Sequence, residues 1–213
     1  IKDNLSNKQF FNDDFSYSIN ENDFFYYEDQ FGGLKLSKPN VLGQFQLENV
    51  STAIATLRTL NLSIKDEHIK RGIVKINSLA RLQEIKTGKL KKLVKNNKLL
   101  IDGSHNENGS YALNKYLQSL DCKKHVIIGM MANKEHEKYL SYFKDISSIT
   151  TIDLKTQPNS ISGKELKDKC KSIPNVQYQP SIEQAINSID LKEGDLLLIT
   201  GSLYLAGEVL NLN

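Results

Sequence analysis

The sequence predicts an α/β protein in which the part of the chain beyond Arg81 forms an open, mostly parallel sheet. In that part, short apolar runs alternate with amphipathic segments, which is the pattern of successive strand and helix units. The predicted strands are KLLIDGS (98–104), HVIIGMM (125–131), ITTIDL (149–154), NVQYQ (175–179) and DLLLITGS (195–202). The predicted helices begin near Glu107, Lys134, Gly163, Ser181 and Leu203.

Residues 1–45 follow a different pattern, in which aromatic and polar residues alternate as in FSYSI and DFFYYED. Turn signals at Gly32-Gly33 and Lys38-Pro39 divide this region, so we expect short antiparallel strands. From Leu47 onward, apolar residues recur at steps of three and four, which predicts a helix ending at Asn61.

A second helix is predicted around DEHIKRGIVKI (66–76). It leads to Asn77-Ser78, the predicted domain boundary, so the expected domains are residues 1–79 and 80–213. The charged stretch GKLKKLVKNNK (88–98) has two open interpretations. It forms either a hairpin with RLQEI (81–85) or a solvated loop.

Composition excludes several classes of protein. The net charge of +3 comes from scattered lysines and is too small to indicate a nucleic-acid partner. No apolar run approaches the roughly 20 residues of a membrane helix. Cys122 and Cys170 have no paired spacing, which fits a reducing cytoplasm. The chain begins at Ile1 in a polar stretch, from which we expect that it starts within a longer protein.

The strongest chemical signal is LLIDGSHNENG (99–109), where a predicted buried strand ends in Asp102 at the start of a helix. In a parallel sheet, ligands bind outside the carboxyl ends of the strands. An acid there accepts hydrogen bonds from ribose hydroxyls, and a helix N-terminus offers N–H groups to an anion. The alternative is that Asp102 and Asn106 cap the helix and His105 is a satisfied loop residue.

Two further strand ends have weaker signals. In LLITGSLYLAGEV (197–209), Gly201 permits close backbone approach and Ser202 either caps the helix or touches a ligand. In HVIIGMMANKEHE (125–137), Lys134 lies near a helix start, and its alternative interpretation is a solvated lysine.

Several site types lack their motifs in this sequence. The four histidines show no HxxxH or HxH spacing, so we expect no metal site built from this chain, and His68 and His125 are predicted to be structural or solvent-facing. The sequence also contains no GxSxG, GxGxxG or GxxxxGK[ST] motif. Their absence removes the serine hydrolase, dinucleotide-fingerprint and phosphate-loop interpretations.

Five segments, taken in order, resemble signatures of the folylpolyglutamate and dihydrofolate synthases, which belong to the Mur ligase superfamily. They span residues 43–210 and are GQFQLENVSTAIATLRTL, ARLQEI, LLIDGSHNENG, IIGMMANKE and LLITGSLYLAGEV. A weaker match, ENDFFYYED (21–29), resembles a strand of that family's central domain.

The resemblance implies a Rossmann-like C-terminal domain with a mostly parallel sheet, preceded by the tail of a Mur ligase central domain. It implies an ATP-dependent ligase that phosphorylates a carboxylate of folate or dihydropteroate and joins it to L-glutamate. Such chemistry accumulates charge on phosphoryl oxygens and calls for Mg²⁺ and cationic side chains. The resemblance also implies a monomer, whereas composition predicts a cytoplasmic protein that binds neither nucleic acid nor membrane.

The resemblance also assigns roles to single residues. Asn49 resembles an asparagine that contacts the nucleotide from the central domain, and Arg81 resembles an interdomain arginine that binds ATP. Asp102 matches the acid that reaches the nucleotide through ribose. On the same basis Asn106, Ser202 and Tyr204 are further predicted nucleotide-binding residues, and His105 and Lys134 are the predicted catalytic residues. Without the resemblance, Asn49 would be a helix cap and Arg81 a surface arginine.

The chain departs from the family pattern in three ways. Glu107 stands where the family has proline, and an insertion between Arg81 and Asp102 is interpreted as a longer hairpin. The phosphate loop, the Mg²⁺ ligands and the central-domain lysine are missing, and they are expected in an N-terminal half. The chain alone is therefore expected to be inactive.

Two other functions stay open. One is a Mur ligase that joins an amino acid to a cell-wall precursor, although the GSLYLAGEV ending favours the folate branch. The other is a non-catalytic nucleotide-binding module from a split or decayed gene.

Overall fold

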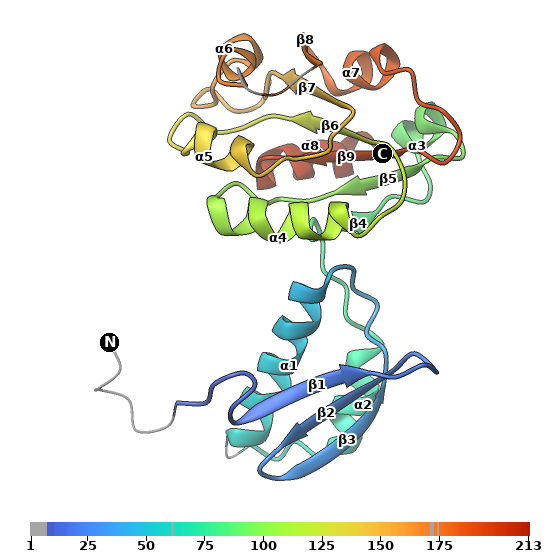
Figure 1. Cartoon of the computed structure of the whole chain (residues 1–213), viewed down its shortest axis with the longest axis vertical. Coiled ribbons are helices and arrows are strands. Elements are labelled where there is room, and N and C mark those ends of the chain that lie inside the picture. The colour runs from blue at the N-terminus through green and yellow to red at the C-terminus, as the bar shows by residue number, and fades with distance from the viewer. Residues whose placement is uncertain (1–7, 61, 171–172, 174) are drawn as a thin grey trace. The chain divides into compact units, whose positions relative to one another are not determined.

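The computed structural model describes residues 8–60, 62–170, 173 and 175–213. The chain divides into two compact units, Ile1–Ser78 and Leu79–Asn213, which are described separately (Figure 1). Within the described residues, no helix is long and apolar enough to cross a membrane.

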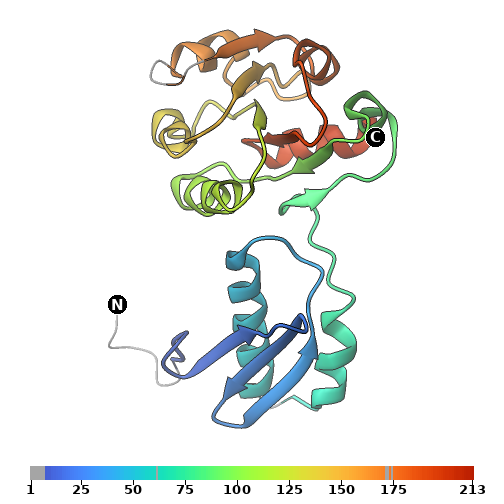
Figure 2. The ribbon, with the colours of Figure 1, turned by 45° about the vertical axis from the view of Figure 1, so that its right-hand side comes forward.

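The first unit is a three-stranded antiparallel sheet covered by two helices (Figure 2). Its strands are β1 (Phe15–Ile19), β2 (Phe24–Asp29) and β3 (Gly32–Ser37), in that spatial order. Helix α1 (Gln44–Thr59) packs on β1 and α2 (Asp66–Ile73) packs on β3. The predicted strands and both predicted helices are confirmed. Helix α1 ends at Thr59, and Asn61, its predicted end, lies outside the described residues.

The register of this sheet follows its buried side chains. Phe25 is paired with Leu36 and Tyr27 with Leu34, and all four side chains face the helices. Because side chains alternate between the two faces of a strand, this register places the apolar set on one side. On the other face of β2 and β3, Glu28, Gly33, Lys35 and Ser37 are exposed, and Phe24 and Tyr26 are half-buried.

The second unit has a six-stranded sheet in the order β4-β5-β9-β6-β7-β8. All its strands are parallel except β4, which pairs antiparallel with β5. The strands are β4 (Gln83–Glu84), β5 (Lys98–Ile101), β6 (Lys124–Ile128), β7 (Ser148–Ile152), β8 (Val176–Gln179) and β9 (Leu196–Thr200). The five strands predicted beyond Arg81 are confirmed, and so is the α/β fold class.

Helices cover both faces of this sheet, as the alternating pattern predicts (Figures 1 and 2). They are α3 (Lys89–Val94), α4 (Glu107–Gln118), α5 (His136–Ser141), α6 (Gly163–Asp168), α7 (Ile182–Ser188) and α8 (Leu203–Leu212). Four of the five predicted helix starts agree within a residue, and α5 begins two residues after Lys134.

Both interpretations of the charged stretch 88–98 are wrong. It contains helix α3, and the preceding segment pairs with β5 through Gln83 and Glu84. The physical reason is the spacing of Leu90 and Val94, four residues apart, whose side chains are buried on one helical face. The longer hairpin predicted between Arg81 and Asp102 is present in part, because β4 and β5 pair antiparallel and α3 lies in the connection between them.

The centre of the second sheet is fully buried. Strands β5, β9 and β6 are apolar at nearly every position because helices cover both of their faces. Polar residues appear where these strands end, and these ends form the edge at which a ligand site is expected.

Candidate functional site

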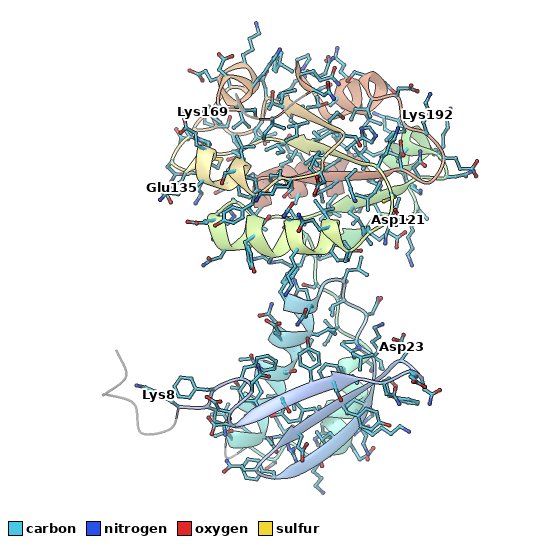
Figure 3. The ribbon with its side chains drawn as sticks, viewed as in Figure 1. Lys8, Asp23, Asp121, Glu135, Lys169 and Lys192 are labelled. Carbon is cyan, nitrogen blue, oxygen red and sulfur yellow. The ribbon has the colours of Figure 1, made fainter. Side chains whose placement is uncertain are left out.

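Three strand ends that are distant in the sequence lie side by side in the second unit. Strand β9 lies between β5 and β6, so the segments beginning at Asp102, Gly201 and Gly129 are neighbours. The backbone N–H of Asp102 donates to Ile199 O at 3.0 Å, and that of Gly129 donates to Thr200 O at 3.3 Å. This edge of the sheet is the candidate site. In Figure 3, Glu135 lies toward this edge, and Asp121 and Lys192 lie toward the opposite one.

Asp102 is the most deeply buried acid of the site, with 3% of its surface exposed. Its Oδ1 accepts the backbone N–H of Ser104 and its Oδ2 accepts that of Leu82, each at 2.8 Å. The carboxylate therefore stabilises the corner that follows β5. The alternative interpretation, in which Asp102 caps α4, is wrong, because Asn106 is the N-cap of that helix. Each carboxylate oxygen has a second lone-pair direction, so the group retains capacity to accept further hydrogen bonds.

His105 follows this corner and is half-buried. Its Nδ1 lies 2.9 Å from the backbone carbonyl of Gly103. Because a carbonyl oxygen only accepts, Nδ1 donates this hydrogen bond, and in the neutral tautomer with that proton Nε2 is the nitrogen that has a lone pair. Within the described residues, Nε2 has no hydrogen-bond partner. The ring is thus oriented by the backbone and has one free nitrogen for ligand or proton transfer.

Two predicted ligand residues cap helices. The Oδ1 of Asn106 accepts the backbone N–H of Gly109 at 2.9 Å, which makes Asn106 the N-cap of α4. Ser202 caps α8 by accepting the backbone N–H of Tyr204 at 3.1 Å. The capping interpretation is confirmed for both residues, and their predicted nucleotide contacts remain predictions. Tyr204 itself is 54% exposed and projects from the first turn of α8.

The two cations of the site have free side chains. Over the residues that the structure describes, Arg81 and Lys134 make no side-chain hydrogen bond or ion pair. Arg81 is exposed. Lys134 is half-buried and lines a polar depression of about 640 Å³, together with Glu137, Asp168 and Lys169. Both cations are therefore available to an anionic ligand.

Asn49 belongs to the first unit, where it is exposed on α1. Its Nδ2 donates to Gln46 Oε1 at 3.3 Å, so it is not a helix cap. It borders an apolar groove of about 510 Å³ between α1 and α2. Its predicted role at the nucleotide remains a prediction.

Sequence reasoning did not find a buried hydroxyl network that joins these strand ends. The Tyr139 hydroxyl lies 2.9 Å from Thr200 Oγ1 and 3.2 Å from Ser104 Oγ. Burial raises the pKa of Tyr139, so its hydroxyl stays protonated. Ser110 Oγ donates to the backbone carbonyl of Tyr139 at 2.5 Å. Ser104 comes shortly after the apolar run of β5, and Thr200 ends the apolar run of β9, so the sequence could have indicated both as residues of the site. Nothing in the sequence distinguishes Tyr139.

Another polar cluster lies at the amino ends of the strands. His125 contacts Ser148 Oγ through Nδ1 at 2.8 Å and Asp195 Oδ2 through Nε2 at 3.3 Å. These contacts join β6, β7 and the start of β9, so His125 is structural, which is the first of the two alternatives predicted for it. In the described ranges, no three His, Cys, Asp or Glu side chains are grouped to hold a metal ion.

Comparison with protein families decides the relationship of this chain. A family model described as "Mur ligase, glutamate ligase domain" matches residues 81–203, more than half of the chain. The chain belongs to the Mur ligase family. The matched segment contains Arg81, the three strand ends and Lys134.

The Mur ligase relatives include folate and cell-wall enzymes. The chain is 23% identical to the dihydrofolate synthase/folylpolyglutamate synthase of Bacillus subtilis, over 81% of the chain and 40% of the relative. It is 30% identical to the UDP-N-acetylmuramoyl-L-alanyl-D-glutamate–2,6-diaminopimelate ligase of Buchnera aphidicola, over 80% of the chain and 34% of the relative.

The fold is also that of a solved Mur ligase relative. E. coli FolC in complex with DHPP and ADP superposes with a TM-score of 0.79 at 22% identity, over 94% of this chain and 46% of that one. The resemblance to the C-terminal half of such enzymes is confirmed. The chain spans less than half the length of the relatives it matches.

Proposed function

We propose that this chain is the C-terminal part of an ATP-dependent ligase that adds L-glutamate to folate or dihydropteroate. The observation that carries the proposal is the family match over residues 81–203, because it includes the candidate site at the carboxyl ends of β5, β9 and β6. The folate synthases among the relatives support the choice of substrate. Residues 1–79 would then be the tail of the central domain. The working protein is proposed to be a cytoplasmic monomer.

The proposed roles follow from the chemistry of each side chain. ATP is a substrate that supplies the phosphoryl group for activating the acceptor carboxylate. Arg81 would bind phosphate oxygens, since its guanidinium is permanently charged and free of protein partners. Asp102 has spare lone pairs for ribose hydroxyls. Asn49, Asn106, Ser202 and Tyr204 are proposed as further nucleotide contacts.

Lys134 and His105 are the proposed catalytic residues. Lys134 would stabilise negative charge that develops on the reacting oxygens. His105 has its ring fixed by Gly103 O and its Nε2 lone pair free, which suits a residue that accepts a proton from the incoming amine. No protein nucleophile is required, because the carboxylate itself takes the phosphoryl group from ATP with release of ADP, and the amine then displaces phosphate to form the amide.

The chain alone is proposed to be inactive. Phosphoryl transfer calls for Mg²⁺, and the Mg²⁺ ligands of the family pattern are among the residues that this sequence lacks. The sequence also has no phosphate loop. Both are proposed to lie in an N-terminal region, which the longer relatives have room to contain.

A second candidate function is the joining of 2,6-diaminopimelate to a cell-wall precursor, which the 30% identical relative favours. The 30% identity to the diaminopimelate ligase is higher than the 23% identity to the folate synthase of Bacillus subtilis. The two functions share ATP and differ in the acceptor and the amino acid, so substrate tests separate them.

The test uses the natural protein that contains this sequence, purified with Mg²⁺ and ATP. ADP release is measured with dihydropteroate and L-glutamate, and separately with UDP-N-acetylmuramoyl-L-alanyl-D-glutamate and diaminopimelate. Release that depends on the first pair supports the proposal, and release that depends on the second supports the alternative. No release with either pair, in protein that is folded by circular dichroism, would indicate a non-catalytic module. The isolated 213-residue chain is the control and should give no release.

A further inference from the structure

Arg81 lies between two residues with unusual backbone conformations. Ala80 has φ of 53° and Leu82 has φ of 48°, both in the left-handed region. Side chains other than glycine rarely adopt this region, and such conformations persist only where the surroundings enforce them. Ala80 and Leu82 are buried, with 4% and 1% exposed surface, whereas Arg81 is exposed. The turn thus buries both neighbours and projects the arginine outward.

Three hydrogen bonds hold this turn in place. The N–H of Leu82 donates to Asp102 Oδ2 and the N–H of Gly103 donates to Ala80 O, each at 2.8 Å. The N–H of Ala80 donates to the side-chain Oε1 of Gln83 at 2.9 Å. Every backbone group that anchors the turn is therefore bound either to the corner after β5 or to Gln83.

Gly103 allows the corner that follows β5 to approach the turn around Arg81 closely. A Cβ atom added there would lie 2.2 Å from Leu203 Cδ2 and 3.4 Å from Ala80 O. The turn, the corner and the first residue of α8 are consequently packed against one another. A change that releases the turn would move Arg81 relative to Asp102 and His105.

We propose that Gln83 is a positioning residue for Arg81, acting through the amide of Ala80, and that the Asp102 carboxylate holds the other side of the same turn. Gln83 acts only as an acceptor here, because the NH₂ of its side chain makes no hydrogen bond within the described part of the chain. The proposal rests on the proposed function insofar as Arg81 meets phosphate. Its structural content is independent of any ligand.

Two variants separate the effect of the Gln83 acceptor oxygen from the effect of the size of the side chain. Gln83→Glu keeps an oxygen that accepts the Ala80 N–H, and Gln83→Leu removes the acceptor at similar size. In the 213-residue chain, ¹⁵N relaxation measures the order of the Arg81 backbone. We expect order in the wild type and in Gln83→Glu, and fast motion at residues 80–82 in Gln83→Leu. Disorder of Arg81 in the wild type, or unchanged order in Gln83→Leu, would overturn the proposal.

MgATP binding tests the link to the ligand. It is measured by isothermal titration calorimetry on the natural protein that contains this sequence, with the same substitutions. Gln83→Leu should weaken binding in the same direction as Arg81→Ala, and Gln83→Glu should not. In the Arg81→Ala background, Gln83→Leu should have no further effect, because the residue it positions is absent. An equal additional loss in that background would contradict a role through Arg81. If the wild-type natural protein does not bind MgATP, the nucleotide part of the proposed function fails, and the relaxation result alone decides the role of Gln83 in the turn.

Discussion

The hydroxyl group of Tyr139 lies 2.9 Å from the side-chain hydroxyl of Thr200, so helix α5 is tied to the last residue of β9. The same Tyr139 hydroxyl lies 3.2 Å from Ser104, in the corner after β5. The network therefore links two of the three strand ends that form the candidate site. It is completely buried, and in such surroundings a polar group left without a partner is costly.

Replacing Tyr139 with phenylalanine should lower the free energy of unfolding by about 1 to 2 kcal/mol, because Thr200 and Ser104 lose their shared partner. Urea denaturation followed by circular dichroism measures the change. Tyr142→Phe is the matched control, since its hydroxyl bonds to Glu107 at the surface and water replaces that contact. Equal effects of the two variants would show that the buried network has no special importance.

Gly201 and Gly207 should respond in opposite directions to alanine. Gly201 has φ of 105°, and an added Cβ would lie 2.8 Å from the backbone oxygen of Gly129. Gly201→Ala should therefore cost about 2 kcal/mol or more of unfolding free energy. Gly207 lies inside α8 with nothing within 4 Å of an added Cβ, so Gly207→Ala should stabilise by about 0.5 to 1 kcal/mol. A destabilising Gly207→Ala would mean that the first turns of α8 are packed differently.

The first unit depends on a buried ion pair. Arg58 Nη1 lies 2.7 Å from Asp29 Oδ1, and the two side chains are 10% and 2% exposed. Arg58 also donates to the carbonyls of Phe31 and Gly32, so it holds the turn between β2 and β3. Arg58→Ala should cost about 3 kcal/mol or more, because Asp29 is left buried without its cation.

A surface ion pair provides the control for Arg58. Lys70 pairs with Glu67 at 2.7 Å on the outside of α2, where both groups are exposed. Lys70→Ala should leave the denaturation midpoint unchanged, since exposed ion pairs contribute little. Similar midpoints for Arg58→Ala and Lys70→Ala would contradict the importance assigned to the buried pair.

Arg81→Ala should raise the ATP concentration needed for half-maximal ligase activity about tenfold or more, because a charge-assisted contact to phosphate is lost. Steady-state kinetics of the natural protein at saturating acceptor and amino acid measure this. Arg71→Ala, at an exposed arginine of α2 outside the candidate site, is the control and should leave the ATP dependence unchanged. Wild-type ATP dependence in Arg81→Ala would refute the proposed role of Arg81.

Cys170 should react with iodoacetamide far more slowly than Cys122. Cys170 is 3% exposed, its thiol donates to Leu166 O, and burial raises its pKa from 9.0 to about 11. The thiolate is the nucleophile, so the folded protein withholds it at pH 8. Mass spectrometry after brief labelling should find the modification at Cys122 until urea unfolds the chain. Comparable labelling of both residues in the folded protein would contradict the buried position of Cys170.

The raised pKa of Cys170 makes the stability of the folded protein depend on pH. The folded state keeps the Cys170 proton to a higher pH than the unfolded state does. The contribution of this thiol to stability is therefore complete below about pH 9 and is lost between about pH 9 and 11. Cys170→Ala should remove that part of the decline in stability at alkaline pH.

The sequence by itself determined most elements of the fold. Strands β5, β6 and β9 were predicted because fully buried parallel strands are continuous apolar runs. The first residues of four of the five helices that follow the predicted strands were predicted to within a residue. The prediction was wrong at residues 88–98, where a hairpin or loop was expected and helix α3 was found. The lysines around Leu90 and Val94 hide the apolar face of this short helix. Local pattern does not reveal which face of such a segment will find a hydrophobic partner.

Tertiary structure alone decided how the site is assembled. Strand β9 is last in the sequence but lies between β5 and β6, and this insertion makes Asp102, Gly129 and Gly201 neighbours. The left-handed turn around Arg81 had no sequence signal, because alanine and leucine do not favour positive φ. Its conformation is enforced by Asp102, which is twenty residues away in the chain. Local propensity acts over a few residues, whereas this strain is balanced by hydrogen bonds and burial that exist only once the sheet has formed.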